Sequence, residues 1–201
     1  MSKIPIIILA AGASTRMGTA KQLLNWGGKT LLEHTLQTAL KTISNTVIVV
    51  LGANYELINK QISSLSVTVL KNEAWQQGLG KSIACGVHYI MDFNPQAEGV
   101  LIVLADQPLI DTAYLNELIQ NFTASKNQII ATSYKKGNYG VPTLFDKKYF
   151  KALSELEDDK GAKHLLNEYQ SFVKALVPPI KNVDLDSKEE YKTLYKANFK
   201  D

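Results

Sequence analysis

The sequence predicts an α/β protein in which helices cover both faces of a mostly parallel sheet. Two observations indicate this class. First, short runs rich in Ile, Val and Leu show little alternation of apolar and polar residues, as in strands buried on both faces. These runs lie at 4–10, 46–51, 67–70, 99–105 and 128–133. Second, amphipathic stretches separate the runs, so strands and helices alternate along the chain. This alternation predicts a three-layer α/β/α sandwich.

Capping signals indicate where several helices begin. Thr30 and Glu33 can form a capping box for a helix whose apolar face runs from Leu32 to Leu40. Further helices are expected at 54–63, 80–92 and 111–122. Candidate caps of later helices are Asp146 and Ser187, the latter in a second capping box with Glu190.

Glycine and proline residues predict two breaks in this pattern. The segment 134–145 contains Gly137, Gly140 and Pro142, and we expect an irregular loop there that is long enough to cover a site. The pair Pro178-Pro179 predicts a break before a last strand and helix. About twenty residues beyond this break cannot form a second core, so we expect one domain over 1–201.

Composition limits the class of protein. The 201 residues are 45% hydrophobic and 20% charged, which is ordinary for a soluble globular protein. The net charge of +3 is small and the 22 Lys and Arg residues are scattered, so nucleic acid is not an expected partner. The single cysteine, Cys85, excludes an internal disulfide and is typical of a reducing compartment. Because the first apolar run is too short to span a bilayer, we expect a cytoplasmic protein without a membrane partner.

A loop of small residues and two cations follows the first strand. The apolar run at 6–10 leads into a loop that contains Arg16 and ends at Lys21. Gly12 and Gly18 lack a Cβ where the chain must turn or approach a ligand, and exposed N–H groups of such a loop can cradle phosphate oxygens. An arginine forks onto phosphate oxygens and a lysine acts as a mobile point charge. The loop therefore indicates a polyphosphate site; the alternative is a plain strand-to-helix turn with incidental cations.

Several better-known motifs are absent from the sequence. The dinucleotide fingerprint G-x-G-x-x-G fails because Ser14 stands at its second glycine. The Gly-Lys-Thr at 28–30 is not a P-loop, since Leu23 stands where its first glycine would be. No G-x-S-x-G elbow occurs, and the three histidines show no ligand spacing. Neither Ser-His-Asp hydrolysis nor a zinc site is therefore expected.

A carboxylate directly follows the fourth apolar run. In open α/β sheets ligands bind beyond the carboxyl ends of the strands, so Asp106 and the loop at 9–21 are expected to converge. Mg²⁺ takes one or two protein carboxylates together with phosphates and waters, which makes Asp106 a candidate Mg²⁺ ligand. Its partner is Asp184 or Asp186, which point the same way in an extended chain, and the pattern alone does not choose between them. The alternative is that Asp186 only caps the last helix.

These motifs resemble a known family. The pattern L-A-A-G-x-S-x-R-M-G-x-x-K-x-L-L, which begins at Leu9, resembles the signature loop of the molybdenum cofactor nucleotidyltransferases, and most closely that of their cytidylyltransferase branch. The resemblance continues at 49–52, 72–78, 104–109, 159–163 and 183–187. It therefore covers nearly the whole chain.

The resemblance implies a fold, an activity and partners. The fold would be a Rossmann-like three-layer sandwich of the nucleotide-diphospho-sugar transferase type. The activity would be Mg²⁺-dependent transfer of CMP from CTP to the phosphate of molybdopterin, with release of pyrophosphate. The implied partners are a nucleoside triphosphate, with CTP favoured, a molybdopterin-like acceptor, and a molybdoenzyme client or a chaperone. The family's acidic C-terminal segment selects Asp186 over Asp184 as the second metal ligand.

The loop and the resemblance together give three groups of expected site residues. The catalytic residues are Arg16, Lys21 and Asp106, and the metal ligands are Asp106 and Asp186. The nucleotide-binding residues are Leu9, Ala10, Ala11, Gly12, Ser14, Arg16, Lys21, Asn72, Gly78, Gly80 and Ser82. Trp75 is expected to belong to the core and not to stack on the base.

Two positions depart from the family pattern. Gly140-Val141-Pro142 stands where the family has G-H-P, and Asp158 stands where its G-D-x-G-A segment has Gly. Because the first of these segments is expected beside the acceptor, the departure bears on the identity of the acceptor. Three other functions stay open. One is a guanylyl- or cytidylyltransferase that acts on another phosphorylated small molecule. Another is a non-catalytic protein that binds and delivers molybdenum cofactor. The third is a nucleotide-binding regulator, which two separated acidic residues besides the phosphate loop disfavour.

Overall fold

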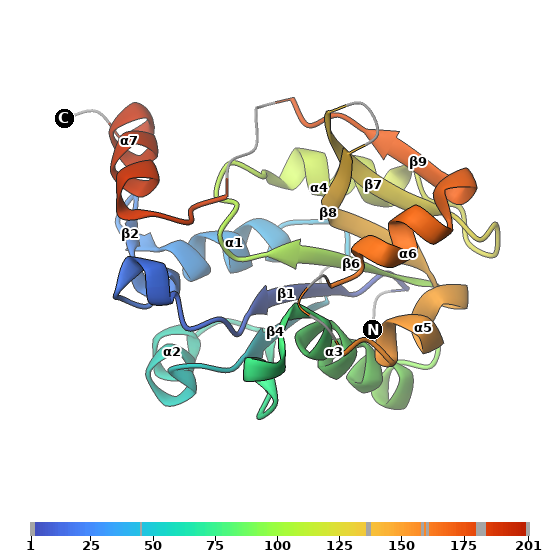
Figure 1. Cartoon of the computed structure of the whole chain (residues 1–201), viewed down its shortest axis with the longest axis horizontal. Helices are drawn as coiled ribbons and strands as arrows, with labels where there is room; N and C mark the ends of the chain where they lie inside the picture. The colour runs from blue at the N-terminus through green and yellow to red at the C-terminus, as the bar shows by residue number, and fades with distance from the viewer. Residues whose placement is uncertain are drawn as a thin grey trace.

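The computed structural model describes residues 3–44, 46–135, 138–157, 159, 161–179 and 184–199, and of Arg16 and Lys135 it describes the backbone only. A seven-stranded sheet forms the middle layer (Figure 1), with the spatial order β5-β4-β1-β6-β8-β7-β9. The strands are β1 (Ile6–Ala10), β4 (Val47–Leu51), β5 (Thr68–Lys71), β6 (Gly99–Leu104), β7 (Ile129–Lys135), β8 (Asn138–Asp146) and β9 (Val173–Leu176).

The sheet is mostly parallel, as the sequence predicts. β4 and β6 pair with the two sides of β1 in parallel, β5 continues in parallel beyond β4, and β7 is parallel to β9. β8 is antiparallel to both of its neighbours, β6 and β7. Because β1 and β6 are parallel neighbours, the segments that follow them leave the sheet at the same edge.

Helices cover both faces of the sheet, which confirms the three-layer sandwich. They are α1 (Leu31–Leu40), α2 (Tyr55–Ile62), α3 (Leu79–Phe93), α4 (Thr112–Gln120), α5 (Phe150–Ser154), α6 (Lys163–Glu168) and α7 (Lys188–Asn198). One core packs α1, α2 and α4 against the face that carries Ile6 and Ile8. The other packs α3, α5 and α6 against the face that carries Ile7 and Leu9. None of the described helices is long and apolar enough to cross a membrane.

Both predicted capping boxes are confirmed. The Thr30 hydroxyl accepts from the Glu33 N–H while the Glu33 carboxylate accepts from the Thr30 N–H at the start of α1. Ser187 and Glu190 make the same exchange at the start of α7. Asp146 also caps a helical turn, the short 3₁₀ segment Lys147–Tyr149.

The prediction of an irregular loop at 134–145 is wrong. Most of that segment belongs to β7 and β8, and β8 lies inside the sheet; Gly137 is outside the described residues. The register between β7 and β8 shifts beyond Ala131, opposite the part of β8 that contains Gly140 and Pro142. Glycine and proline are tolerated at such irregularities, and the buried run that follows them pairs regularly. Two breaker residues therefore mark a bulged stretch of a strand and not its absence.

The last part of the chain also differs from the expectation. In the described part of the chain, the last strand of the sheet is β9, which precedes the Pro178-Pro179 pair. The strand expected after that pair falls partly on 180–183, outside the described residues, and residues 184–187 form no strand. Helices α5 and α6 are short, five and six residues. α5 follows directly on the helical turn that Asp146 caps, whereas α6 begins without a side-chain cap.

A small hairpin and α7 stand beside the sheet. Strands β2 (Asn25–Trp26) and β3 (Lys29–Thr30) pair around Gly27 and Gly28. Both glycines have positive φ, +60° and +84°, which a two-residue hairpin turn of this kind requires. Figure 1 shows α7 next to this hairpin, at one side of the molecule.

The capping box of α1 gives a test of the fold. Thr30→Ala removes the hydroxyl that accepts from the first turn and should lower the free energy of unfolding by about 1 kcal/mol. Thr30→Ser keeps the hydroxyl acceptor and Glu33→Gln keeps the reciprocal bond. The free energy of unfolding of both variants should therefore stay within about 0.5 kcal/mol of that of the unchanged protein. Urea unfolding followed by circular dichroism measures all three. Equal losses for Thr30→Ala and Thr30→Ser would show that the cap does not stabilise the helix.

Candidate active site

Gln22 holds the loop that follows β1. Its side-chain amide donates to the carbonyl oxygens of Ala10 and Gly12, both at 2.8 Å, and the residue is 2% exposed. The Lys21 N–H donates to the Ser14 hydroxyl at 3.2 Å, which closes the loop. Ser14 and Gly18 both adopt left-handed backbone conformations on either side of the 3₁₀ turn Thr15–Met17. The loop is therefore built around one buried amide, that of Gln22, which was not among the expected site residues.

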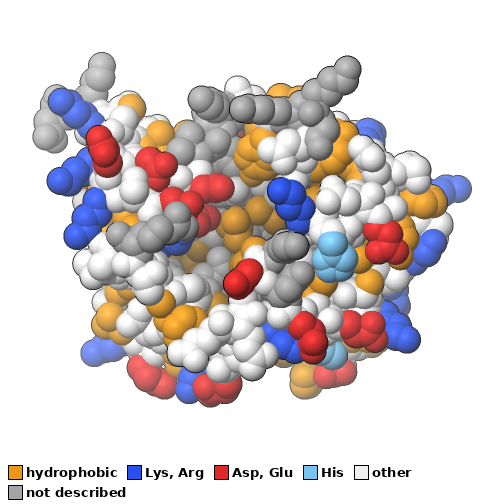
Figure 2. Space-filling model, viewed as in Figure 1, with side chains coloured by type: hydrophobic (Ala, Val, Ile, Leu, Met, Phe, Trp, Pro, Cys, Tyr) orange, Lys and Arg blue, Asp and Glu red, His pale blue; other side chains and the backbone are white. Residues whose placement is uncertain are grey.

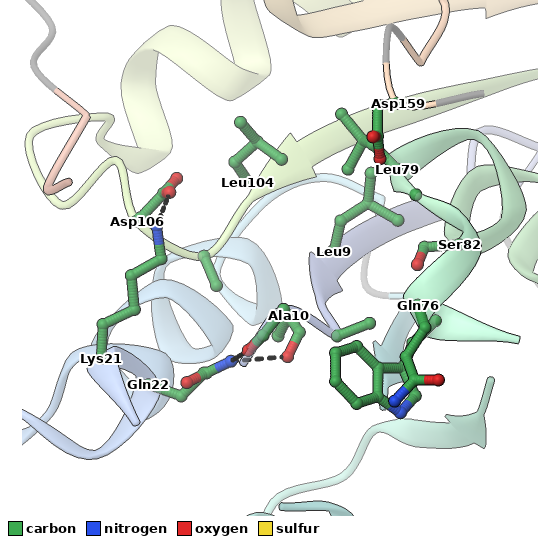
Figure 3. A pocket seen from close by; sticks show the side chains of 15 residues that line it. Leu9, Ala10, Lys21, Gln22, Gln76, Leu79, Ser82, Leu104, Asp106 and Asp159 are labelled. Atoms are coloured by element: carbon green, nitrogen blue, oxygen red, sulfur yellow. Dashed lines mark hydrogen bonds and ion pairs between the residues drawn. The ribbon is translucent and has the colours of Figure 1, made fainter. Parts of the chain in front are cut away.

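Lys21 joins the loop to the end of β6 and to the segment before α7. Its ammonium group donates to Asp106 Oδ2 and to the Leu185 carbonyl oxygen at 3.4 Å, and lies 3.6 Å from Asp186 Oδ1. The Lys21 and Asp106 side chains are 20% and 14% exposed, so the pair is largely shielded from water. Three segments far apart in the sequence thus meet at one charged group, as Figure 3 shows for Lys21 and Asp106.

The residues around Lys21 fit a divalent cation. Asp106 Oδ1 is buried and has no hydrogen-bond partner among the described residues. Two carboxylates and a carbonyl oxygen converge on the lysine ammonium, and these hard oxygen atoms are the ligands that Mg²⁺ takes. No group of three or more His, Cys, Asp and Glu side chains in the described part of the chain is arranged to hold a metal. A Mg²⁺ ion on Asp106 and Asp186 would therefore complete its coordination with phosphate and water oxygens.

A cavity of about 390 Å³ extends from Lys21 across the ends of β1 and β6. Figure 2 shows this face hollowed in the middle, with hydrophobic side chains on its floor and acidic side chains gathered along one side. Its wall is formed by Leu9, Ala10, Ala11, Gly12, Lys21, Gln22, Trp75, Gln76, Gly78, Leu79, Ser82, Leu104, Ala105, Asp106 and Asp159. A smaller cavity of about 170 Å³ shares Gly12 and Lys21 with it and is also lined by Ser14, Thr15, Met17 and Asp186.

Most of the expected site residues lie on these two cavities. Leu9, Ala10, Ala11, Gly12, Lys21, Gly78, Ser82 and Asp106 line the larger one, and Ser14 and Asp186 line the smaller one. A Cβ built on Gly12 would meet no atom within 4 Å, so the space beside this backbone is open to a ligand. The side chain of Arg16 is outside what the structure describes; its backbone lies in the 3₁₀ turn of the loop.

Two expected nucleotide-binding residues do not line either cavity. Asn72 is buried and donates to the Ser82 hydroxyl at 3.0 Å, so it supports a wall residue from behind. Gly80 is buried in the first turn of α3. Trp75 was expected to be a core residue. It is instead half-buried and lines the larger cavity.

Asp159 is a wall residue that was not among the expected site residues. It lies against Gly78, where a Cβ would come within 2.3 Å of Asp159 Oδ1 and 2.9 Å of its backbone nitrogen. Gly78 also has a φ of +109°, so both its conformation and its neighbour require glycine. Asp159 begins one of the segments that carry the family resemblance, and its neighbour Asp158 lies outside the described residues.

Another cavity, of about 360 Å³ and called the second cavity from here on, lies beside the larger one. The two share Leu9, Leu79 and Leu104. Its other wall residues come mainly from β7, β8, α3 and α6, and they include Tyr139, Gly140, Val141, Thr143, Lys163 and Leu166. Most of this wall is apolar or aromatic. The cavity therefore suits a flat ring system better than a second polyphosphate.

Gln107 organises a polar cluster on the wall of the second cavity. Its side-chain amide donates to the Tyr134 hydroxyl at 2.9 Å and to Asp184 Oδ1 at 2.8 Å. Gln107 Oε1 is buried without a partner among the described residues. Partial burial, together with the nearby charges of Asp106 and Asp186, raises the pKa of Asp184 above its usual value, although the Gln107 bond opposes the shift. Asp184 is thus bonded to Gln107, whereas Asp186 lies by Lys21.

This geometry predicts which carboxylates bind a divalent ion. Asp106→Asn and Asp186→Asn should each raise the dissociation constant for Mn²⁺ by about tenfold or more, because each removes a charged oxygen ligand. Asp184→Asn keeps an oxygen that can accept from Gln107, so it should change the dissociation constant for Mn²⁺ less than about threefold. Electron paramagnetic resonance of free Mn²⁺ measures the three constants. A larger effect for Asp184 than for Asp186 would assign the second ligand to Asp184.

Comparison with known proteins identifies the family of the chain. The family model of the MobA-like NTP transferase domain matches residues 6–173. The purine catabolism protein PucB of Bacillus subtilis is 30% identical over 95% of each chain. The bifunctional protein GlmU of Corynebacterium diphtheriae is 32% identical over 59% of this chain, which spans about a quarter of that relative's length.

Solved structures show the same fold over the whole chain. Rv0371c of Mycobacterium tuberculosis is 27% identical, with a TM-score of 0.83 over 97% of this chain and 98% of that one. A complex of Rv0371c with manganese is similar, with a TM-score of 0.77, 26% identity and coverage of 98% and 100%. The fold, the loop after β1 and the matched family model together show that the chain belongs to the family of the MobA-like NTP transferase domain and is a nucleotidyltransferase.

Proposed function

We propose that this nucleotidyltransferase moves CMP from CTP to the phosphate of molybdopterin and releases pyrophosphate. The observation that carries the proposal is the convergence of Lys21, Asp106 and Asp186 at the mouth of a cavity large enough for a nucleotide. The cavity runs from Lys21 and Asp106 to Ser82 and Asp159 (Figure 3). Trp75 also lines the part where the base and ribose would lie.

The reaction needs positioned charge more than proton transfer. An oxygen of the acceptor phosphate forms a bond to the α-phosphorus of CTP, and the bond from that phosphorus to the bridging oxygen of the β-phosphate breaks. Pyrophosphate leaves with the electron pair. The attacking phosphate is already an anion, so no strong base is required, and none of the described residues that line the three cavities is a histidine. Bringing two anions together and neutralising their charge is the main task.

Lys21 and Arg16 are the residues suited to that task. Lys21 holds its ammonium group at the junction of the two cavities that contain Gly12, where the phosphates would lie. A Mg²⁺ ion on Asp106 and Asp186 would supply further neutralisation of the triphosphate oxygens. The backbone beside Gly12 has open space, and the loop is held by Gln22, so the loop's geometry is set before a ligand binds. The Rv0371c complex with manganese supports the use of a divalent ion.

The second cavity supports the proposed acceptor. It lies next to the nucleotide cavity, and its wall includes Gly140 and Val141, from the segment that departs from the family's G-H-P. The mostly apolar wall with one polar cluster fits a pterin ring that makes hydrogen bonds along one edge. Val141 in place of His removes a polar group from this wall. That change favours a second candidate, a nucleotidyltransferase for a different phosphorylated small molecule.

One experiment separates these functions. The purified protein is incubated with CTP, GTP, ATP or UTP, Mg²⁺ and molybdopterin, and the products are identified by mass spectrometry. The proposal expects molybdopterin cytosine dinucleotide and an equal amount of pyrophosphate. Pyrophosphate formed only with another phosphorylated acceptor would support the second candidate. Binding of molybdopterin without pyrophosphate release would indicate a delivery protein and contradict both.

Lys21 provides a test of the mechanism. Lys21→Ala should lower kcat by about 10²–10³, as removal of a group that stabilises transition-state charge typically does. Arg16→Ala is expected to do the same. Lys21→Arg is the matched control, since it keeps the positive charge while changing the shape of the charged group. Its kcat should fall less than that of Lys21→Ala. Turnover within threefold of the unchanged protein in both alanine variants would contradict the phosphate site.

Ala11 provides a test of base preference. It is 6% exposed and lines the nucleotide cavity. The resemblance to the molybdenum cofactor nucleotidyltransferases implies Ala-Ala-Gly here in a cytidylyltransferase and Ala-Gly-Gly in a guanylyltransferase. A single methyl in such a pocket is worth about 1–3 kcal/mol, or roughly 10–200-fold in specificity. The unchanged protein should have a higher kcat/KM for CTP than for GTP. Ala11→Gly should raise kcat/KM for GTP and so lower the ratio of the two values. A preference for GTP in the unchanged protein would refute the cytidylyl assignment but not the nucleotidyl transfer.

A further inference from the structure

The segment before α7 is tied to the active site through Leu185. The Leu185 N–H donates to the Asp106 carbonyl oxygen at 3.0 Å, and its own carbonyl oxygen accepts from Lys21. The Leu185 side chain is fully buried, in a small core with Trp26 and Leu31. This core is separate from the two cores that hold the sheet and its helices. The next residue is Asp186, so the anchor of Leu185 sets the place of that carboxylate.

An aromatic cluster holds α7 against the β2–β3 hairpin. The ring of Trp26 meets the ring of Phe199 edge-on, with a centroid distance of 5.1 Å and an interplanar angle of 86°. The ring centroid of Tyr195 lies 6.1 Å from that of Trp26 and 4.9 Å from that of Phe199. Gly27 makes room for this contact, because a Cβ there would come within 2.6 Å of the Phe199 ring. Edge-to-face and tilted pairs of this kind are favourable beyond the area that they bury.

Two hydrogen bonds fix the register of α7 on the hairpin. The Asn25 side-chain amide donates to the Tyr195 hydroxyl at 3.0 Å, and the Tyr191 hydroxyl donates to the Asn25 carbonyl oxygen at 2.8 Å. In the first turn of the helix, next to Tyr191, Glu190 accepts from the backbone N–H groups of Asp186 and Ser187 at 3.1 and 2.8 Å. The position of Asp186 is thus coupled to the first turn of α7, and α7 is coupled to the hairpin.

The docking of α7 rests on few contacts. None of its residues is fully buried, and its contacts with the hairpin are made by half-buried aromatic and aliphatic side chains. Lysines and glutamates occupy much of its remaining surface. A helix held in this way opens at a lower free energy than the core of the protein. Loss of one ring from the cluster should therefore change the fraction of molecules in which α7 is docked.

We propose that Trp26, Tyr195 and Phe199 form a latch that positions Asp186 and the Leu185 carbonyl oxygen at the cation site. These are positioning residues, since they act through Leu185 and Asp186 and do not line the nucleotide cavity. The inference rests on the proposed function only in requiring a divalent ion on Asp106 and Asp186. Affinity for that ion then falls in proportion to the fraction of molecules with α7 docked. By reciprocity, the ion stabilises docked α7 to the same extent.

The test compares variants of the latch with a matched control on the same helix. Phe199→Ala should raise the Mn²⁺ dissociation constant about 3–10-fold, the range that corresponds to loss of about one aromatic contact. The double variant Tyr195→Ala/Phe199→Ala should raise it further, and Phe199→Leu, which keeps apolar volume, should recover most of the affinity. Thr193→Ala changes an exposed residue of α7 outside the cluster and should leave the constant unchanged.

Two further readouts separate positioning from general destabilisation. In the whole 201-residue chain, Mn²⁺ should slow hydrogen exchange of the α7 amides, and Asp186→Asn should abolish that protection. Affinity for CTP in EDTA should stay within about twofold in the latch variants, because α7 contributes no residue to the nucleotide cavity.

Three results would overturn the latch. One is a Mn²⁺ affinity for the double variant equal to that of Thr193→Ala. Another is a parallel loss of CTP affinity in EDTA. The third is absence of Mn²⁺ binding by the unchanged protein, which would remove the cation site from the proposed function as well. The first two results leave the proposed function standing, so the two ideas fail separately.

Discussion

The contact between Lys21 and Asp106 is the interaction on which the arrangement of the site depends. β1 and β6 are parallel neighbours, and the Ala105 N–H donates to the Leu9 carbonyl oxygen where the two strands end. The loop after β1 and the turn after β6 therefore leave the sheet together, with a cation on one and an anion on the other. The same ammonium group reaches the segment before α7. The sheet topology thus brings three distant parts of the chain to one point.

The sequence predicted the elements whose signals are local. Strands buried on both faces give unbroken apolar runs, and a capping box needs only two side chains three residues apart, so β1, β6, α1 and the start of α7 were all predictable. β8 was missed because its Gly140 and Pro142 favour a turn locally, while pairing with two neighbouring strands decides the outcome. Such pairing is a tertiary effect that overrides propensity.

The candidate site was predictable to a similar extent and for a similar reason. Lys21 and Asp106 stand out because charged residues follow apolar strands at the edge where ligands bind. Gln22 was missed because a glutamine that bonds backbone carbonyls leaves no pattern in the sequence. Asp159 was missed because its role depends on a close approach to Gly78, eighty-one positions earlier in the chain. Contacts of this length can be recognised only once the chain is folded.

Leu9, Leu79 and Leu104 form a partition with one cavity on each side. Substitution of a partition residue would alter both cavities together, which constrains how those three positions can vary. Residues that face only the second cavity, such as Tyr139, Val141 and Leu166, carry no such double constraint. One side of the partition can therefore diverge while the other is preserved. This division gives a physical route by which a single scaffold can keep one ligand and exchange the other during evolution.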